Sequence, residues 1–117
     1  MAAEHYTLKN SGTELVVKVY TNDANGGTHD IDLSELAENG ETITGLSFKE
    51  LFWTCRPNKT ITVQRIDGVN LEGGYFFANT GHWHFNNFND STYSGLPFRF
   101  TFDGPGTVIL RLAKATS

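Results

Sequence analysis

The sequence has few of the residues with which small proteins form disulfide bonds or structural metal sites. Its single cysteine, Cys55, rules out an intramolecular disulfide. Nine lysines and arginines are outnumbered by thirteen acidic residues, giving a formal net charge of -4, and they are scattered along the chain. A basic patch for nucleic-acid phosphates is therefore not expected. No apolar run has membrane-spanning length, and the first residues lack a secretion-signal pattern. We expect partners other than nucleic acid or membrane.

Signatures of catalysis are also missing. Cys55 lies in an apolar run, which predicts a buried and unreactive thiol. No serine has the Gly-x-Ser-x-Gly setting of a nucleophile elbow. Gly73 and Gly74 precede a strand-like run instead of a helix, so they do not predict a phosphate-binding loop. The sequence predicts a protein that is not an enzyme and holds no cofactor.

The chain is rich in aromatic residues (13%, with nine Phe) and in glycine (twelve). Rings and branched side chains favour half-buried pleated surfaces. The clearest pattern lies in residues 98–103 and 107–114, where apolar residues recur at every second position around the turn cluster 103–106. Those residues are Phe98, Phe100, Phe102, Val108, Leu110 and Leu112. We expect a hairpin here with one apolar face that the rest of the chain must cover.

The remaining chain predicts an all-β fold of about eight or nine short strands, with residues 1–117 forming a single domain. Antiparallel strands in two facing sheets, a β-sandwich or jelly-roll-like arrangement, suit this spacing. Residues 1–5 are expected to be an arm that orders on a partner, and residues 115–117 a tail.

Three local features are less regular. Residues 34–38 are compatible with one helical turn, but Asn39-Gly40 is a strong hairpin signal and we favour a hairpin there. The parity of the apolar pattern changes between Phe48 and Leu51, which predicts a bulge near Lys49-Glu50. Residues 68–74 are expected to be a loop before a short strand at 75–78.

Two segments could suggest a metal ion. His82 and His84 lie on the same side of a predicted strand, as in the metal-binding cupins. Cupins have a glycine about six residues before the first histidine and an acid about four after the second. Here position 76 is Phe, and the first acid after His84 is Asp90. We therefore predict no metal and interpret the histidines as surface or interface residues.

The second segment contains Asp23, Asn25 and Asp30, which resemble a loose set of calcium ligands. Counted from Asp23, an EF-hand needs Gly at its sixth position and Glu at its twelfth, but the chain has Thr28 and Ser34. We predict a solvated loop.

Residues 75–93 combine many aromatic side chains with asparagines. Consecutive rings point to both faces of a strand, so one small core cannot bury them all. Exposed rings serve as anchors in protein contacts or as platforms for sugars, and the segment could also fold its rings into a minor core of its own. We predict a protein interface made by Tyr75, His82, Trp83, His84, Phe88 and Tyr93.

In size, acidic composition and strand plan, including residues 4–10 and 104–110, the chain resembles the cement or decoration proteins of tailed-bacteriophage capsids. The resemblance implies a non-enzymatic virion protein, made in the host cytoplasm, on the outer capsid surface. It implies binding to the major capsid protein or other virion proteins, and assembly as a dimer or trimer. The alternative is a carbohydrate-binding or adhesin-type module of a tail fibre or receptor-binding protein. A small metal-dependent jelly-roll enzyme is a third possibility.

Overall fold

The computed structural model describes residues 3–11, 13–38, 40–68, 70–84 and 95–116, and for residues 70, 72–77 and 84 it describes the backbone alone. Across these residues the chain forms nine strands and one 3-10 turn, η1. The all-β prediction is confirmed. The elements are β1 (Glu4–Asn10), β2 (Glu14–Thr21), β3 (Gly27–Ile31), η1 (Leu33–Leu36), β4 (Ile43–Cys55), β5 (Thr60–Asp67), β6 (Asn70–Ala78), β7 (Thr80–His84), β8 (Phe98–Phe102) and β9 (Gly106–Thr116).

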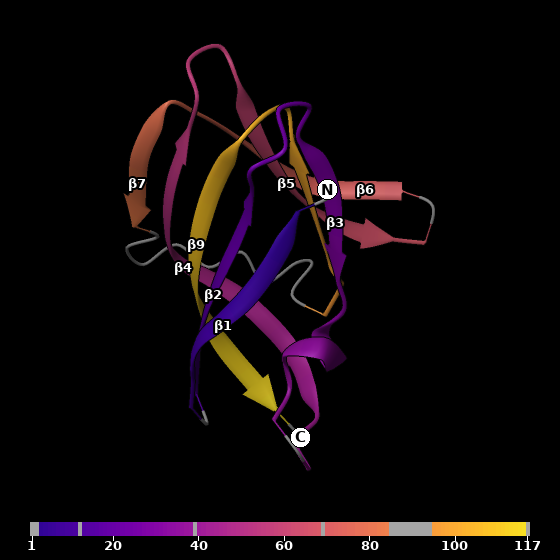
Figure 1. Ribbon diagram of the computed structural model, residues 1–117. Coiled ribbons are helices and arrows are strands. Elements are labelled where there is room, and N and C mark those ends of the chain that lie inside the picture. Colours follow the sequence, from indigo (N-terminus) through magenta and orange to yellow (C-terminus); the bar gives the residue numbers. More distant parts are fainter. Residues whose placement is uncertain (1–2, 12, 39, 69, 85–94, 117) are drawn as a thin grey trace.

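The strands form two antiparallel sheets packed face to face (Figure 1). The five-stranded sheet has the order β1-β2-β9-β4-β7, and the four-stranded sheet has the order β3-β8-β5-β6. From β2 onward, the chain changes sheet at every connection except β5 to β6. This is the strand order of a jelly roll, in which β1 is an added edge strand.

The hairpin predicted for residues 98–114 is wrong. β8 pairs with β3 and β5, whereas β9 pairs with β2 and β4, so the turn between β8 and β9 crosses from one sheet to the other. The alternation itself is correct, because all six apolar residues of the pattern are at most 2% exposed. The apolar faces of the two strands pack against each other from opposite sheets. Alternation in the sequence is the same for two strands that cross between sheets and for two strands that pair as a hairpin.

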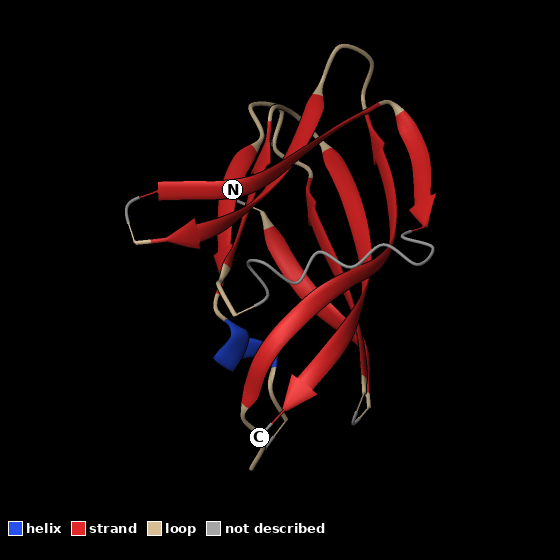
Figure 2. Cartoon of the chain, turned by 180° about the vertical axis from the view of Figure 1, so that it is seen from behind, coloured by secondary structure: helices blue, strands red, loops and turns tan. Residues whose placement is uncertain are grey.

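The hairpin predicted at Asn39-Gly40 is also wrong. The strands on either side, β3 and β4, belong to different sheets, and the described part of the connection contains η1. Figure 2 shows this turn at the end of the sandwich where β4 begins. It buries Leu33 and Leu36, and Glu35 caps it by accepting a hydrogen bond from the Asp32 N–H at 2.6 Å. Covering the sandwich end therefore outweighed the local turn signal.

The core lies between the sheets and consists of alternate residues from both. Leu15, Val17 and Val19 of β2, which occupy alternate positions in the sequence, are at most 2% exposed. The bulge predicted near Lys49-Glu50 is confirmed by a register shift between Phe48 and Glu50.

Arg65 is an unexpected member of the core, at 1% exposed. Its guanidinium carbon lies 3.9 Å from the ring centroid of Phe98 and 5.4 Å from that of Phe48. The guanidinium donates hydrogen bonds to the Leu96 carbonyl, at 2.7 Å, and to the Leu46 carbonyl. The side chain points inward because Arg65 follows the alternation of Ile61 and Val63 and pairs with the inward-facing Phe98. The register shift between Val63 and Arg65 places its extra residue on β6 and leaves this direction unchanged.

Lys114 is a second charged residue of the core and is the cross-strand partner of Leu46. Its side chain is fully buried, and its ammonium binds the Glu41 carboxylate at 2.8 Å, the Ser11 carbonyl at 2.6 Å and the Asn10 side-chain oxygen. Asn10 ends β1, Ser11 follows it in the turn to β2, and Glu41 belongs to the connection from η1 to β4. Burial of an ammonium is tolerated when each of its donors has a partner.

The ends and one loop differ from expectation. Ala3 is buried at 4% exposed, and Glu4 and His5 belong to β1, so the arm cannot extend to residue 5. β9 continues to Thr116, into the predicted tail. β6 begins at Asn70, within the predicted loop 68–74, and with the end of β5 it extends sideways from the body (Figures 1 and 2).

Candidate binding surface

The outer face of the five-stranded sheet is the broadest regular surface of the fold. Strand register arranges its side chains in rows that cross all five strands. The central row is Tyr6, Lys18, Ile109, Phe52 and His82. The row on one side is Glu4, Tyr20, Thr107, Thr54 and Thr80. The row on the other side is Lys9, Val16, Arg111 and Glu50, and the backbone of His84 lies opposite Glu50. We call these residues, with the adjoining Glu14, the outer face.

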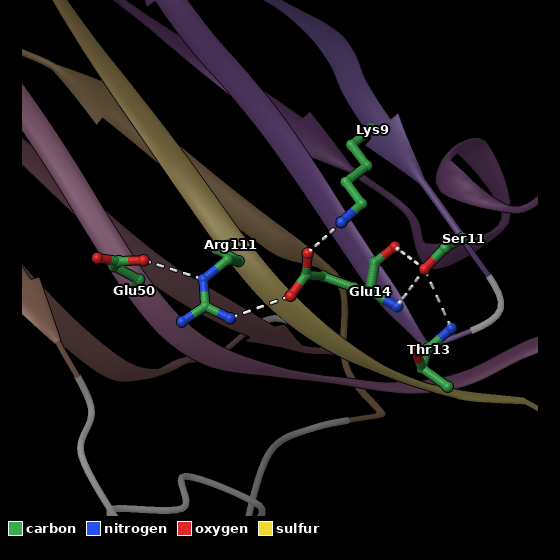
Figure 3. Close-up of polar contacts among 6 residues, drawn as sticks. All are labelled: Lys9, Ser11, Thr13, Glu14, Glu50 and Arg111. Carbon is green, nitrogen blue, oxygen red and sulfur yellow. Dashed lines mark hydrogen bonds and ion pairs between the residues drawn. The ribbon is translucent and has the colours of Figure 1, made fainter.

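Most charged side chains of the outer face are joined in one network, of which Figure 3 shows Lys9, Glu14, Arg111 and Glu50. Arg111 lies between two acids: its Nε donates to Glu50 Oε1 at 2.9 Å, and its Nη1 donates to Glu14 Oε2 at 3.0 Å. Lys9 binds the other oxygen of Glu14 at 2.9 Å, and His82 Nε2 lies 2.6 Å from Glu50 Oε2. The result is a continuous chain of contacts from β1 to β7.

The network shifts the acid–base equilibria of its members. Hydrogen bonds from Arg111 and then His82 hold the pKa of Glu50 below its usual value. Lys9 and then Arg111 do the same for the pKa of Glu14. Both glutamates are therefore ionised near neutral pH, and most of their hydrogen-bonding capacity is used within the face.

Two ring pairs stand on the outer face. Phe52 and His82 are cross-strand partners whose rings stack with centroids 4.4 Å apart and planes 5° from parallel. Tyr6 and Tyr20 stack at 5.9 Å, and the Tyr20 hydroxyl donates to Glu4 at 3.0 Å. Tyr6 and Glu4 raise the pKa of Tyr20 to about 12, so this phenol stays protonated. Phe52 is 43% exposed and Tyr6 is 54% exposed.

The predicted interface residues are not on one surface. His82 belongs to the outer face, whereas its neighbour Trp83 pairs with the inward-facing Leu51 and is 39% exposed at the edge of the sandwich. The backbone of His84 lies opposite Glu50, and that of Tyr75 lies opposite Val63 in the other sheet. Phe88 and Tyr93 lie outside the described residues. The prediction that these six residues form an interface stays a prediction.

Sequence reasoning passed over most of the outer face because its members come from five separate strands. Phe52 was hidden within the apolar run 51–53, where the bulge before Leu51 decides which residues face outward. Tyr6 lies in a weakly alternating segment. The alternation of β2 separates two faces, but only the strand order shows that the outward one adjoins β1 and β9.

Other candidate sites offer less. Among the described side chains, no group of three or more His, Cys, Asp or Glu could hold a metal ion. In the suspected calcium loop, Asp23 accepts from the Asn25 N–H at 2.9 Å, and Asp30 forms two hydrogen bonds with Arg99. The Asp23 contact fits the solvated loop that the sequence predicts, whereas Asp30 lies in β3 and binds its cross-strand partner Arg99.

Cys55 differs from its prediction, because it is half-buried instead of fully buried. Its thiol lies 3.3 Å from the Lys59 carbonyl and 3.4 Å from the Asn79 carbonyl. It lines a shallow hollow of about 250 Å³ together with Thr54, Arg56, Pro105 and Gly106. The hollow holds no described base beside the thiol, so it offers no arrangement for nucleophilic catalysis.

Comparison of the chain with known protein families and with curated proteins finds no match. No helix in the described part of the chain has the length and apolar character needed to cross a membrane. The candidate surface therefore has to be judged on its own chemistry.

Proposed function

We propose that the protein is a non-enzymatic attachment protein that binds an assembled protein shell through the outer face of its five-stranded sheet. The observation that carries the proposal is the exposure of Tyr6 and Phe52 on a face whose other side already contributes to a complete core. Exposed rings that the core does not need are available to a second molecule, and aromatic residues are common anchors of protein interfaces.

The charge balance of the outer face also favours a protein partner. It carries three acids (Glu4, Glu14 and Glu50) and three bases (Lys9, Lys18 and Arg111), so the net charge of -4 belongs to the rest of the chain. A balanced face can approach a largely uncharged protein surface without repulsion, while the acidic remainder disfavours other orientations.

Binding to an assembled shell would also explain how the protein acts. A protein that binds the assembled shell but not its separate subunits stabilises that shell by mass action. Many identical sites on one particle make modest individual contacts sufficient. The jelly roll occurs in viral capsid proteins, as well as in lectins and cupins, so the fold is compatible with a capsid decoration protein without identifying one.

Carbohydrate binding is the second candidate, and Trp83 is the described ring that favours it. A sugar platform needs ring faces open to solvent, but Phe52 and His82 cover one face of each other, and Tyr6 and Tyr20 do the same. Trp83 is 39% exposed on β7, an edge strand of the five-stranded sheet. Titration of saccharides with tryptophan fluorescence as the readout tests this alternative.

The shell proposal is tested by rate-zonal sedimentation of a particle fraction from the source that carries the gene. We expect the chain to sediment with the particles, and recombinant protein to rebind particles from which it has been stripped. Recovery of the chain only as a slowly sedimenting protein would contradict the proposal.

Two glutamate variants locate the contact. Phe52→Glu places a charge in the central row of the outer face and should reduce rebinding to particles at least about tenfold, an effect of the size expected for an interface anchor. Ala24→Glu, in the exposed loop after β2, is the matched control and should rebind normally. Equal rebinding by both variants would exclude the outer face, and thermal melts of each confirm folding.

Trp83→Ala examines the interface predicted from the sequence in the same assay. Loss of rebinding with an unchanged melting temperature would assign Trp83 to the contact. Equal loss of rebinding and of thermal stability would instead assign it to the fold.

A further inference from the structure

His5 and His29 face each other across the seam between the two sheets. His5 belongs to β1, the edge strand of the five-stranded sheet, and His29 belongs to β3, the edge strand of the four-stranded sheet. Nδ1 of His5 lies 2.7 Å from Nε2 of His29, and the ring centroids are 4.9 Å apart. The contact therefore links two edge strands that do not pair through their backbones.

The two rings meet head-on. The separation of their centroids is close to the distance between the nitrogens plus the short distance from each centroid to its own nitrogen. Such an arrangement requires the two nitrogens to point at each other, as in a hydrogen bond from an N–H to a lone pair. Two imidazoles that share a metal ion would instead both point to a third position.

This hydrogen bond depends on the number of protons that the pair carries. A neutral pair has one N–H to donate and one lone pair to accept it, and a pair with one extra proton keeps this arrangement. A second extra proton removes the last lone pair and leaves two cations in contact. Burial lowers the pKa of His29, and the charge of His5 lowers it further.

Three carboxylates surround the pair and act in the opposite direction on the pKa of His29: Glu35, Asp30 and Glu4, in decreasing order. Each is already engaged, by the Asp32 N–H, the Arg99 guanidinium and the Tyr20 hydroxyl respectively. They favour the first added proton on the pair. They do not relieve the repulsion between two charged rings that point at each other.

We propose that the His5–His29 pair is an acid-sensitive clasp that holds β1 against the four-stranded sheet and opens when both rings are charged. β1 contributes Tyr6 and Lys9 to the outer face, so opening the clasp loosens one of the five strands of that surface. The structural part of this inference concerns the isolated protein. Its consequence for binding, weaker attachment at acid pH, rests on the proposed function.

The direction of the pH effect follows from the lowered pKa of His29. A group whose pKa is lower in the folded state than in the unfolded state contributes stability above its unfolded value, and that stability is lost as the pH falls. For a histidine the unfolded value is about 6.5, so β1 should loosen as the pH decreases below about 6.5. Because exchange chemistry itself varies with pH, amide protection must be expressed relative to intrinsic exchange rates.

The experiment uses the full chain carrying His82→Gln and His84→Gln, in which His5 and His29 are the remaining histidines. NMR titration of the ring protons should show two coupled steps, with the second displaced to lower pH. Hydrogen exchange should show a fall of about tenfold in the protection of β1 amides for each unit by which the second step is displaced. Amides of β4 and β9 in the middle of the sheet serve as the internal reference.

His29→Phe is the matched variant, because it keeps a ring and removes the titrating nitrogens. Protection of its β1 amides, relative to β9, should no longer depend on pH between 7 and 5. Two independent titrations near the ordinary histidine value, or a β1 that loosens equally in His29→Phe, would overturn the clasp. If His29→Phe does not fold, the ring titration of the His82→Gln/His84→Gln protein still decides.

Rebinding to particles at pH 7 and pH 5 then separates the clasp from the proposed function. A clasp that opens in the isolated protein while no particle binding is found at either pH would leave the clasp standing and remove the attachment function. Binding at pH 7 that is unchanged at pH 5, with an open clasp, would show that β1 is not part of the contact and would overturn the regulatory consequence.

Discussion

The two faces of β9 differ sharply in what their side chains contact. On the inner face, Val108, Leu110 and Leu112 are at most 1% exposed and pack against the opposite sheet. On the outer face of the same strand, Ile109 lies beside Phe52, and Arg111 lies between two glutamates. One face is shaped by packing, and the other is not constrained by the core.

This difference separates what stabilises the protein from what could bind a partner. Inner residues cannot change size without leaving a cavity or causing strain. Outer residues can change without that penalty, so the rings and charges found there need another explanation, and contact with a second molecule supplies one. Single substitutions at adjacent residues of β9 can test whether the inner face determines stability and the outer face determines binding.

The largest expected effect is on the inner face. Leu110→Ala removes a side chain that is 1% exposed and should reduce the free energy of unfolding by about 2–5 kcal/mol, measured by urea denaturation. The adjacent outer residue provides the matched control: Ile109→Ala should reduce it by about 1 kcal/mol or less. Particle rebinding should follow the reverse order, with the larger loss for Ile109→Ala at temperatures where both variants are folded. Similar losses of stability for the two variants would erase the distinction between the faces.

Arg65 tests whether the inner face is purely a matter of apolar packing. Arg65→Met keeps a long side chain between the rings of Phe48 and Phe98 but removes the donors to the Leu46 and Leu96 carbonyls. Buried acceptors that lose their donors should cost about 1–3 kcal/mol of unfolding free energy.

The control for Arg65→Met is Arg99→Met on the outside of β8, where the guanidinium binds Asp30 in partly exposed surroundings. Its effect should be about 1 kcal/mol or less, as for other surface ion pairs. An Arg65→Met protein as stable as the parent would show that ring packing alone holds this position, and that the carbonyls find other donors.

The same contrast explains how much of the structure could be predicted. Alternation identifies inner positions such as Leu15, Val17 and Val19, because packing between sheets repeats every second residue. It does not identify which strands pair, so the connection from β8 to β9 was mistaken for a hairpin. The hairpin predicted at Asn39-Gly40 is wrong for a related reason: β3 and β4 belong to different sheets, and their connection contains η1.

The outer face could be predicted only in fragments. His82 was identified as a surface or interface residue, but its stacking partner Phe52 lies thirty residues away, just after the bulge in β4. Tyr6, Lys18 and Ile109 join the same row only through strand order, which a single sequence does not contain. Arg65 was missed although it follows the alternation of Ile61 and Val63, because an arginine is rarely fully buried and is ordinarily assigned to the surface.

The smallest expected effect on stability is on the outer-face network, and it should appear only as a pH dependence. Glu14 and Glu50 have lowered pKa values in the folded protein, so their contribution is present above their ordinary value near 4.5 and is lost as the pH falls below it. Arg111→Met removes a donor to both and should make stability decline less steeply in acid. The measurement is the urea midpoint at pH 7 and pH 3.5 for the parent and the variant.

Because these groups are exposed and screened, 1 M salt should remove most of the difference between the two proteins. A difference that persists in high salt and is equal at both pH values would mean that Arg111 acts by packing its stem, which would make the outer face more like the inner one than its charges indicate.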